Sequence, residues 1–341
     1  MRNESRIQFD AYMARIAELN HVANAATRFS VEPSVQQTLE QKIQESSEFL
    51  GRINNVGVIE QQGEKIGLGI GSTIANTVDT RLPEKRRVPF DPTALASNKY
   101  ECTQTNFDTA LRYAKIDSWA KFPDFQNKLR DAIIKRQALD IITIGFNGVS
   151  RADTSNREAN PLLQDVNKGW LQHIREDAPA RVMSDGAEEG VLHVYDGGDY
   201  ANLDALVFDA VNELIDPWYR EDTELVVVLG RGLFADKYFP LINTTQPPSE
   251  TLALDLLVSQ KRVGGLQTVR APYFPDGTIL ITRLDNLSRY YQEGARRRHI
   301  KDNPEKDQIE NYESSNDAYV VEDYGCAALI ENIVTAKAQE P

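Results

Sequence analysis

The long segment Val56–Asn98 restricts the folds that this chain can adopt. It begins with a pattern of two strands around the turn at Gln62-Gly63. It continues with polar residues, three prolines and the basic cluster Lys85-Arg86-Arg87, and it offers few side chains to a hydrophobic core. Loops of this length are uncommon in compact domains and are often functional. We therefore expect the segment to project from the body of the protein.

A second informative segment, Pro272–Gly325, combines strongly basic and strongly acidic stretches. It contains the pair Tyr290-Tyr291 and the run Arg296-Arg297-Arg298-His299. From Asp302 to Tyr324 it then carries eight acidic residues and one basic residue. No nucleophile–base pair, metal cluster or phosphate loop is recognisable in it. The pattern favours a surface that meets other copies of the same chain.

Composition places the chain among soluble globular proteins. Its 341 residues are 41% hydrophobic and 26% charged, enough for a full core and two or three subdomains. No apolar run is long enough for a membrane span, and the N-terminus lacks the apolar core of a signal peptide. We therefore expect a cytosolic product. The two cysteines, Cys102 and Cys326, lie far apart and indicate neither a disulfide framework nor a zinc site.

The formal net charge of −13 argues against a protein that coats nucleic acid. Such proteins bind phosphate through lysine and arginine, with release of counterions. The charge is compatible with a protein that encloses DNA, because a wall of like charge does not adhere to it.

Two helices are predicted near the N-terminus. Apolar residues recur at three- and four-residue spacing from Phe9 to Leu19, which favours a helix ending at Asn20. A second helix is predicted from Ser34, whose hydroxyl could cap the amide of Gln37 while that side chain reaches back. The joining segment is small, polar and predicted to be accessible. The first helix is thus either a detachable arm or part of an ordinary helix–loop–helix packed on the core, and the pattern leaves both open.

The longest predicted helix begins near Asp124 and ends at Asn147-Gly148. At about 1.5 Å per residue it would span roughly 35 Å, the length of a domain. Before it, Tyr100–Ile116 alternates enough to be extended. After it, Pro161–Ile174 is predicted to be a further helix, and Ser184–Gly198 is a candidate hairpin or boundary.

The region Tyr200–Val269 is predicted to be a separate α/β subdomain inserted between extended segments. Its pattern is helix, strand, helix, helix, and the pair Gly264-Gly265 interrupts the chain after it. The four predicted elements are Asn202–Ile215, Glu224–Gly230, Leu233–Ile242 and Thr251–Ser259.

The chemical motifs are weak. The glycines of GLGIGS have the wrong spacing for a dinucleotide loop, and no G-x-S-x-G is present. The four histidines are scattered, so no metal or cofactor is expected. A soluble two-domain α/β enzyme of unknown specificity remains an alternative, but it would need a convergent polar pocket for which no motif exists. A nucleic-acid-binding module is a third hypothesis, and the acidic balance disfavours it.

Two basic clusters, Lys85–Arg87 and Arg296–Arg298, allow several interpretations. They could be solvated loop charges, which contribute little, or nucleic-acid contacts, which lack interleaved aromatics here. The loop cluster Lys85–Arg87 of one copy could also meet the acidic segment Asp302–Asp323 of a neighbouring copy. Opposite charges on two surfaces of one chain favour head-to-tail contacts, which close into rings or shells.

Taken in order, long stretches of the sequence resemble the major capsid protein of P2-like tailed phages. They include FDAYMARIAELN, GEKIGLGI, AIIKRQALDIITIGFNGVSRADTS, GGDYANLDALVFDAVNELIDPWY and the Pro272–Gly325 block. The resemblance extends from Arg2 to about Ile330 and is weakest at Arg81–Pro92, Ser184–Tyr195 and after Glu331.

The resemblance implies an α+β, HK97-like capsid fold. It assigns each segment of the chain to a part of that fold. Residues 1–33 would be a precursor segment, 34–55 the N-arm, 56–98 the extended loop, 99–199 the peripheral domain with its spine helix 124–147, 200–269 the axial domain, 270–331 the C-terminal part of the peripheral domain, and 332–341 a flexible tail.

The resemblance also implies a structural protein and not an enzyme. By this resemblance the chain would assemble, like other members of the family, into pentamers and hexamers of an icosahedral head around double-stranded DNA. Assembly would take place in the cytoplasm of the host bacterium. The implied partners are further copies of the chain, a scaffolding protein, a maturation protease and a portal protein, with no membrane. The protease would trim the N-terminus within Ala25–Pro33, near Phe29 and Ser30.

For the contacts between subunits we expect the three loop bases Lys85, Arg86 and Arg87 to face the acidic segment, including Glu310 and Glu313. The run Arg296, Arg297 and Arg298 is expected to contribute as well. Some proteins with this fold cross-link a loop lysine to an asparagine. No partner for Lys85 is recognisable, so non-covalent assembly is predicted.

Overall fold

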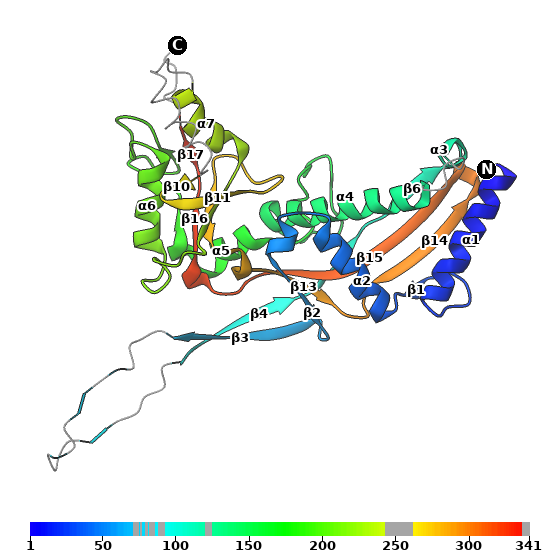
Figure 1. The fold of residues 1–341 in the computed structure, drawn as a ribbon, viewed down its shortest axis with the longest axis horizontal. Coiled ribbons are helices and arrows are strands. Elements are labelled where there is room, and N and C mark those ends of the chain that lie inside the picture. Colours follow the sequence, from blue (N-terminus) through cyan, green and yellow to red (C-terminus); the bar gives the residue numbers. More distant parts are fainter. Residues whose placement is uncertain are drawn as a thin grey trace.

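The computed structural model describes residues 1–70, 75, 77–78, 81, 86–87, 93–119, 125–242 and 262–335. Its body is elongated and built on two main sheets, and a long hairpin extends from one side (Figure 1). We call the seven-stranded sheet and its helices the peripheral part, and the six-stranded sheet and its helices the axial part.

The peripheral sheet is organised around one long strand, β15. Five strands follow one another in the order β1-β14-β15-β13-β2, and β5 and β6 also pair with β15. All pairings are antiparallel except β13 with β2. The strands are β1 (Phe29–Ser30), β2 (Asn54–Val58), β5 (Thr103–Asn106), β6 (Thr109–Arg112), β13 (Leu287–Gln292), β14 (Arg297–Asn303) and β15 (Gln308–Val321).

Three helices cover this sheet: α2 (Pro33–Glu45), α4 (Phe125–Asn147) and α5 (Trp170–Asp177). The side chain of Trp170 is fully buried, and its indole N–H donates to the Ser288 carbonyl at 2.9 Å. Its ring lies 5.2 Å from that of Phe146 and 5.3 Å from that of Tyr319. This aromatic cluster joins α4 and α5 to β15, because large rings bury the most apolar area per residue.

The axial sheet has the strand order β10-β11-β9-β12-β16-β7, with α6 (Leu203–Leu214) and α7 (Arg231–Ile242) beside it. Asn202 caps α6 by accepting from the Ala205 N–H at 2.9 Å. The strands are β7 (Val182–Met183), β9 (Val226–Leu229), β10 (Arg262–Val263), β11 (Leu266–Arg270), β12 (Ile279–Thr282) and β16 (Ala327–Ile330). Two short strands, β8 (Leu192–His193) and β17 (Ile333–Val334), pair with each other nearby.

Alternate residues of the axial strands enter two different cores. Val226 and Val228 join the core that also contains Trp170, whereas Val227 and Leu229 join the core of α6. A strand that is apolar on both faces is typical of a sheet covered on both sides. The axial sheet therefore contributes side chains to both hydrophobic cores and joins the two parts of the molecule.

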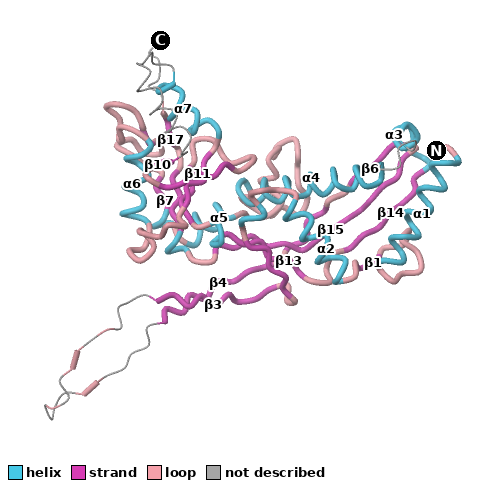
Figure 2. The backbone as a smooth tube through the Cα atoms, viewed as in Figure 1, coloured by secondary structure: helices cyan, strands magenta, loops and turns pink. Residues whose placement is uncertain are grey.

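Part of the predicted projecting segment Val56–Asn98 lies in the described residues, and most of residues 71–92 lie outside them. Strands β3 (Gln62–Ile70) and β4 (Thr93–Glu101) form a two-stranded hairpin that leaves the body (Figure 2). One detail differs from the sequence pattern, because β2 and β3 do not pair with each other. β2 joins β13 in parallel, and β3 takes β4 as its partner.

The N-terminal segment is docked on the body. Helix α1 (Asn3–Leu19) lies along the far end of the peripheral sheet, and Ala25, Phe29 and Val31 are 1%, 7% and 5% exposed. The prediction that this linker is exposed holds only in part, because Ala26–Arg28 and Ser30 are exposed while its apolar side chains pack against Ile300. The packed helix–loop–helix is the arrangement observed.

Three local predictions also need correction. Helix α2 starts at Pro33 with no side-chain cap, so the Ser34–Gln37 capping box does not form. The extended stretch ends at Arg112, and α3 (Tyr113–Trp119) follows it. The helix predicted at Pro161–Ile174 begins only at Trp170 and continues to Asp177. Before it the chain is a loop, in which the Gln164 carbonyl accepts hydrogen bonds from the Val149 and Ser150 N–H groups.

The long helix, α6 and β9 lie where the sequence places them. The axial sheet also uses β7, β12 and β16, which come from outside Tyr200–Val269. The predicted helix Thr251–Ser259 lies outside the described residues. In the described part of the chain, no helix combines the length and the apolar character that crossing a membrane requires.

Candidate assembly interface

A network of buried charges ties α2 to the centre of the peripheral sheet. Arg289 on β13 and Arg296 just before β14 are 3% and 1% exposed. Glu40 on α2 bridges them, with its Oε2 2.5 Å from Arg289 Nη1 and its Oε1 2.7 Å from Arg296 Nη1. Each arginine also has an acid from β15, because Asp317 lies 2.5 Å from Arg289 Nη2 and Glu313 lies 2.6 Å from Arg296 Nη2.

The network keeps its carboxylates ionised at neutral pH. Burial by itself raises the pKa of Glu40, but the charges of Arg289 and Arg296 outweigh it and hold that pKa below its ordinary value. The same balance of burial against Arg296 lowers the pKa of Glu313. Removing either arginine would leave uncompensated negative charge buried in this site, which is strongly destabilising.

The other two arginines of the basic run have different surroundings. Arg297 is exposed. Arg298 is half-buried and donates to Asn311 Oδ1 at 2.8 Å and to the Tyr12 hydroxyl at 2.9 Å. Three consecutive arginines therefore occupy the interior, the surface and the contact with α1.

Only some of the acidic side chains of the segment Asp302–Asp323 are exposed. Glu313 belongs to the buried network, and Glu310 is 7% exposed. Three hydrogen bonds, the first from the Tyr312 hydroxyl at 2.7 Å, lower the pKa of Glu310 to about 2. Glu305 and Asp307, in the turn between β14 and β15, are exposed. These two acids remain available to another molecule.

The hairpin is anchored at its base. Lys65 donates from Nζ to the Val321 carbonyl at 2.9 Å and lies 3.2 Å from Glu322 Oε2. The rings of Tyr100 and Tyr290 meet edge to face with centroids 5.1 Å apart. These contacts fix the direction in which the hairpin leaves the sheet.

The side chains of Arg86 and Arg87, in the segment between β3 and β4, are exposed. Lys85 lies outside the described residues.

The region around the expected cleavage site is a strand in the structure. In β1, Phe29 pairs with Arg298 and Ser30 with Arg297 of β14, and the next residue, Val31, donates its N–H to the Arg296 carbonyl at 2.8 Å. A protease needs an extended chain that can leave its neighbours. The bond near Phe29 and Ser30 is therefore protected as long as β1 stays paired.

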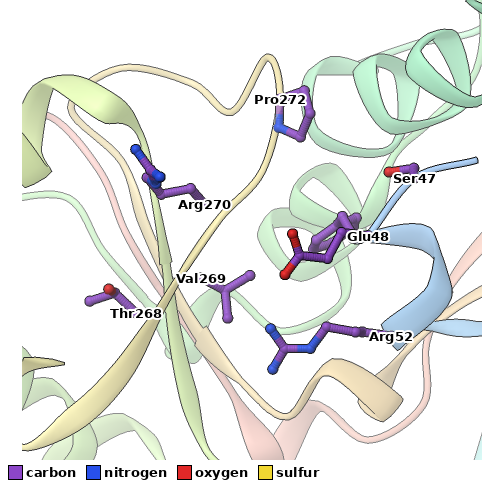
Figure 3. Close-up of a pocket in the computed structure, with 8 residues that line it drawn as sticks. Ser47, Glu48, Arg52, Thr268, Val269, Arg270 and Pro272 are labelled. Carbon is purple, nitrogen blue, oxygen red and sulfur yellow. The ribbon is translucent and has the colours of Figure 1, made fainter. Parts of the chain in front are cut away.

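An open cleft of about 310 Å³ lies between the segment after α2 and β11 (Figure 3). The side chains of Glu48, Arg52 and Val269 point into it. On its other side, Arg270 places its guanidinium 5.6 Å from the ring centre of Phe234. An open, charged lining suits contact with a polypeptide better than enclosure of a small molecule.

Comparison with known proteins gives this geometry its context. A family model described as "Phage major capsid protein, P2 family" matches residues 8–333. The chain belongs to the P2 family of phage major capsid proteins.

Individual relatives agree over nearly the whole length of the chain. It is 55% identical to a capsid protein of Escherichia phage P2, covering 100% of this chain and 98% of that protein. It is 43% identical to the major capsid protein of Serratia phage KSP20, covering 99% of both.

The fold of this capsid protein is α+β and HK97-like. A chain of the satellite phage P4 procapsid, in a structure that includes the size determination (Sid) protein, matches with a TM-score of 0.81 and 53% identity. That match covers 98% of this chain and 99% of the other. The capsid of an empty GTA particle shares only 15% identity but has a TM-score of 0.50 over 85% of this chain, which supports the fold alone.

The structure separates the site residues expected in this capsid protein. Arg296 and Glu313 are paired inside one subunit and cannot meet a neighbour, because both side chains are buried against each other. Glu310 is likewise held within its own chain. Arg297 remains open to a partner.

Glu40, Arg289 and Asp317 were not predicted from the sequence to be members of a buried network. One signal was present, because Glu40 lies one helical turn from Gln36 and from Ile43 on the buried side of α2. A carboxylate in that position needs a buried cation.

Proposed function

We propose that this chain is the shell-forming subunit of an icosahedral phage head, which it builds as pentamers and hexamers around double-stranded DNA. The observation that carries the proposal is the near-complete structural match to a procapsid chain at 53% identity. A hairpin that projects from a two-part body also suits a subunit that overlaps its neighbours. No described feature favours the alternative of a small-molecule enzyme.

Sedimentation tests this function directly. The chain is produced in bacteria together with the scaffolding protein of a P2-like phage and is fractionated on a density gradient. A large, uniform, fast-sedimenting species that contains the chain supports the proposal. Material that stays at the size of a monomer or small oligomer, with scaffolding protein present, would refute it.

Assembly with a scaffolding protein, a protease and a portal protein in the host cytoplasm is part of the same proposal. Trimming by the protease falls near Phe29 and Ser30, where β1 pairs with β14. The cut therefore requires β1 to separate from β14 first. Mass spectrometry of finished particles is expected to give a chain that starts within Ala25–Pro33, and a start at Met1 or Arg2 would contradict trimming.

Contacts between subunits are proposed to be electrostatic. The bases Lys85, Arg86 and Arg87 of one copy would meet the acidic turn of another, which we narrow to Glu305 and Asp307 because these side chains are exposed. Reversing the three loop charges should lower the yield of shells, and reversing both acids as well should restore part of it. Normal yield of the loop variant would refute this contact.

Assembly is proposed to be non-covalent. Shells boiled in denaturant should then release single chains on a gel. A ladder of cross-linked chains would contradict the proposal.

A further inference from the structure

The face with which α2 contacts the sheet is unusually polar. Its three most buried residues, Gln36, Glu40 and Ile43, are each 1% exposed and only Ile43 is apolar, while the apolar Val35 and Leu39 are only partly buried. The buried face of α4, by contrast, includes Ile134 and Ile141. Burial of apolar area is the main force that holds a helix on a sheet, so α2 gains less from docking than α4 does.

The contacts of Gln36 are ones that water can replace. Its Nε2 donates to the Gln292 carbonyl at 3.0 Å, and its Oε1 accepts from the Gly294 N–H at 2.9 Å. Both partners are peptide groups, one at the end of β13 and the other in the turn between β13 and β14. Exchanging such hydrogen bonds for hydrogen bonds to water changes the free energy by little.

The charges of the buried network are divided unevenly between α2 and the sheet. The sheet and its connecting turn supply two arginines and two acids, and each arginine has its own acid: Asp317 for Arg289 and Glu313 for Arg296. Glu40, the only charge that α2 adds, makes the buried site net negative. Without Glu40 both arginines stay paired, and no buried cation is stranded.

The docked state also leaves one donor unused. In the described part of the chain, Nε of Arg289 is buried and has no hydrogen-bond partner. A buried donor without a partner is costly, so docking of α2 does not complete the network.

Firm anchors bound α2 on both sides. Before it, Val31 is 5% exposed and its N–H is bonded to the Arg296 carbonyl. After it, Phe49 is 3% exposed and its ring lies 5.2 Å from that of Phe146. Any release of α2 is therefore confined to about residues 33–46.

We propose that α2 is a latch, which leaves the sheet locally while its two anchors hold and while both sheet arginines stay neutralised by their own acids. The buried network then has two stable arrangements, one with Glu40 and one without. The inference concerns the single subunit and goes beyond the proposed function, so the failure of one would not be the failure of the other.

Hydrogen exchange of the full, unassembled chain tests the latch. In the unaltered protein, amides of α2 should exchange about tenfold or more faster than those of α4, because the local opening of α2 needs less free energy. Glu40→Ala should speed the exchange of α2 about tenfold further, as expected for lost charged hydrogen bonds. The amides of β13 and β15 should stay within about twofold of their original rates.

Asp317→Asn is the matched control. It removes an acid that belongs to the sheet, so it should speed exchange in β13 and β15 as well as in α2. The latch is refuted if Glu40→Ala speeds exchange in the sheet as much as in α2, if it leaves α2 unchanged, or if it prevents folding. Unchanged exchange in the sheet of Asp317→Asn would refute the charge assignment on which the latch rests.

Discussion

At the scale of single residues, neighbouring side chains of the same type differ greatly in what they contribute. Arg296 is 1% exposed and bound to two carboxylates, whereas Arg297 beside it is exposed. The strand alternation near β14 points successive side chains to opposite sides. The pair therefore forms a built-in comparison between a buried and a solvated arginine.

Replacing the buried arginine should be far more damaging than replacing its neighbour. Arg296→Met leaves Glu40 and Glu313 without that cation, and we expect the free energy of unfolding to fall by about 3–5 kcal/mol. Arg297→Met should change it by less than about 0.5 kcal/mol. Denaturant unfolding of the two purified variants measures both values, and equal effects would contradict the internal role of Arg296.

The network also predicts how stability depends on pH. The pKa values of Glu40 and Glu313 are lower in the folded chain than the ordinary value of 4.5. Their contribution is therefore fully present above about pH 4.5 and is lost as pH falls through the folded-state values. Unfolding free energies measured from pH 7 downward should stay level to about pH 5 and then decline. A steady fall in the free energy of unfolding between pH 7 and pH 5 would argue against this role of Glu40 and Glu313.

Sequence reasoning could identify charges but not their burial. The run at Arg296 and the acids near Glu313 were recognised as unusual, and both were assigned to the surface. Their pairing depends on strand register between β14 and β15, with Glu40 supplied by a helix from the other end of the chain. Neither is visible in local spacing.

At the scale of elements, close approach of backbones decides how α4 and α5 pack. A Cβ at Gly145 would lie 2.2 Å from the Trp170 ring, and one at Gly169 would lie 2.3 Å from the Gly145 carbonyl oxygen. Glycine at these positions is required by space, since neither has a left-handed backbone.

Filling that space should separate the helices. Gly145→Ala is expected to destabilise the protein by about 1–3 kcal/mol, because an overpacked core forces side chains out of their rotamers. Gly51→Ala is the control, because Gly51 is exposed and the atom nearest to an added Cβ would be the Gln44 carbonyl oxygen at 3.9 Å. Thermal melting compares the two, and an equal loss of stability would contradict the steric account.

Elements with a long regular pattern were predictable from the sequence, and short or tertiary-dependent ones were not. The 23-residue α4 and the helix α6, which Asn202 caps, were predicted from their apolar spacing. The short strand β1 and the partner of β2 depend on contacts more than 200 residues away. The sequence left open whether the N-terminal helix is a detachable arm or is packed on the body for the same reason, because its docking surface on β14 and β15 is remote in sequence.

At the scale of the whole molecule, two continuous parts and a projecting hairpin define the subunit (Figure 1). The resemblance of the full sequence gave the fold and the family, while composition and motifs gave neither. The subunit by itself offers little surface against which the two-stranded hairpin can be buried, and two strands alone are marginal in water. The hairpin is therefore expected to be completed by another copy.

The central claim is that the chain closes into a shell, and electron microscopy of the assembled particle tests it most directly. Particles produced with the scaffolding protein should reconstruct as closed icosahedral shells of pentamers and hexamers. Each subunit should fit the structure described here, with its hairpin lying on a neighbour. Small uniform particles that contain no pentamers or hexamers would contradict the account. A hairpin that contacts only its own subunit would contradict it as well.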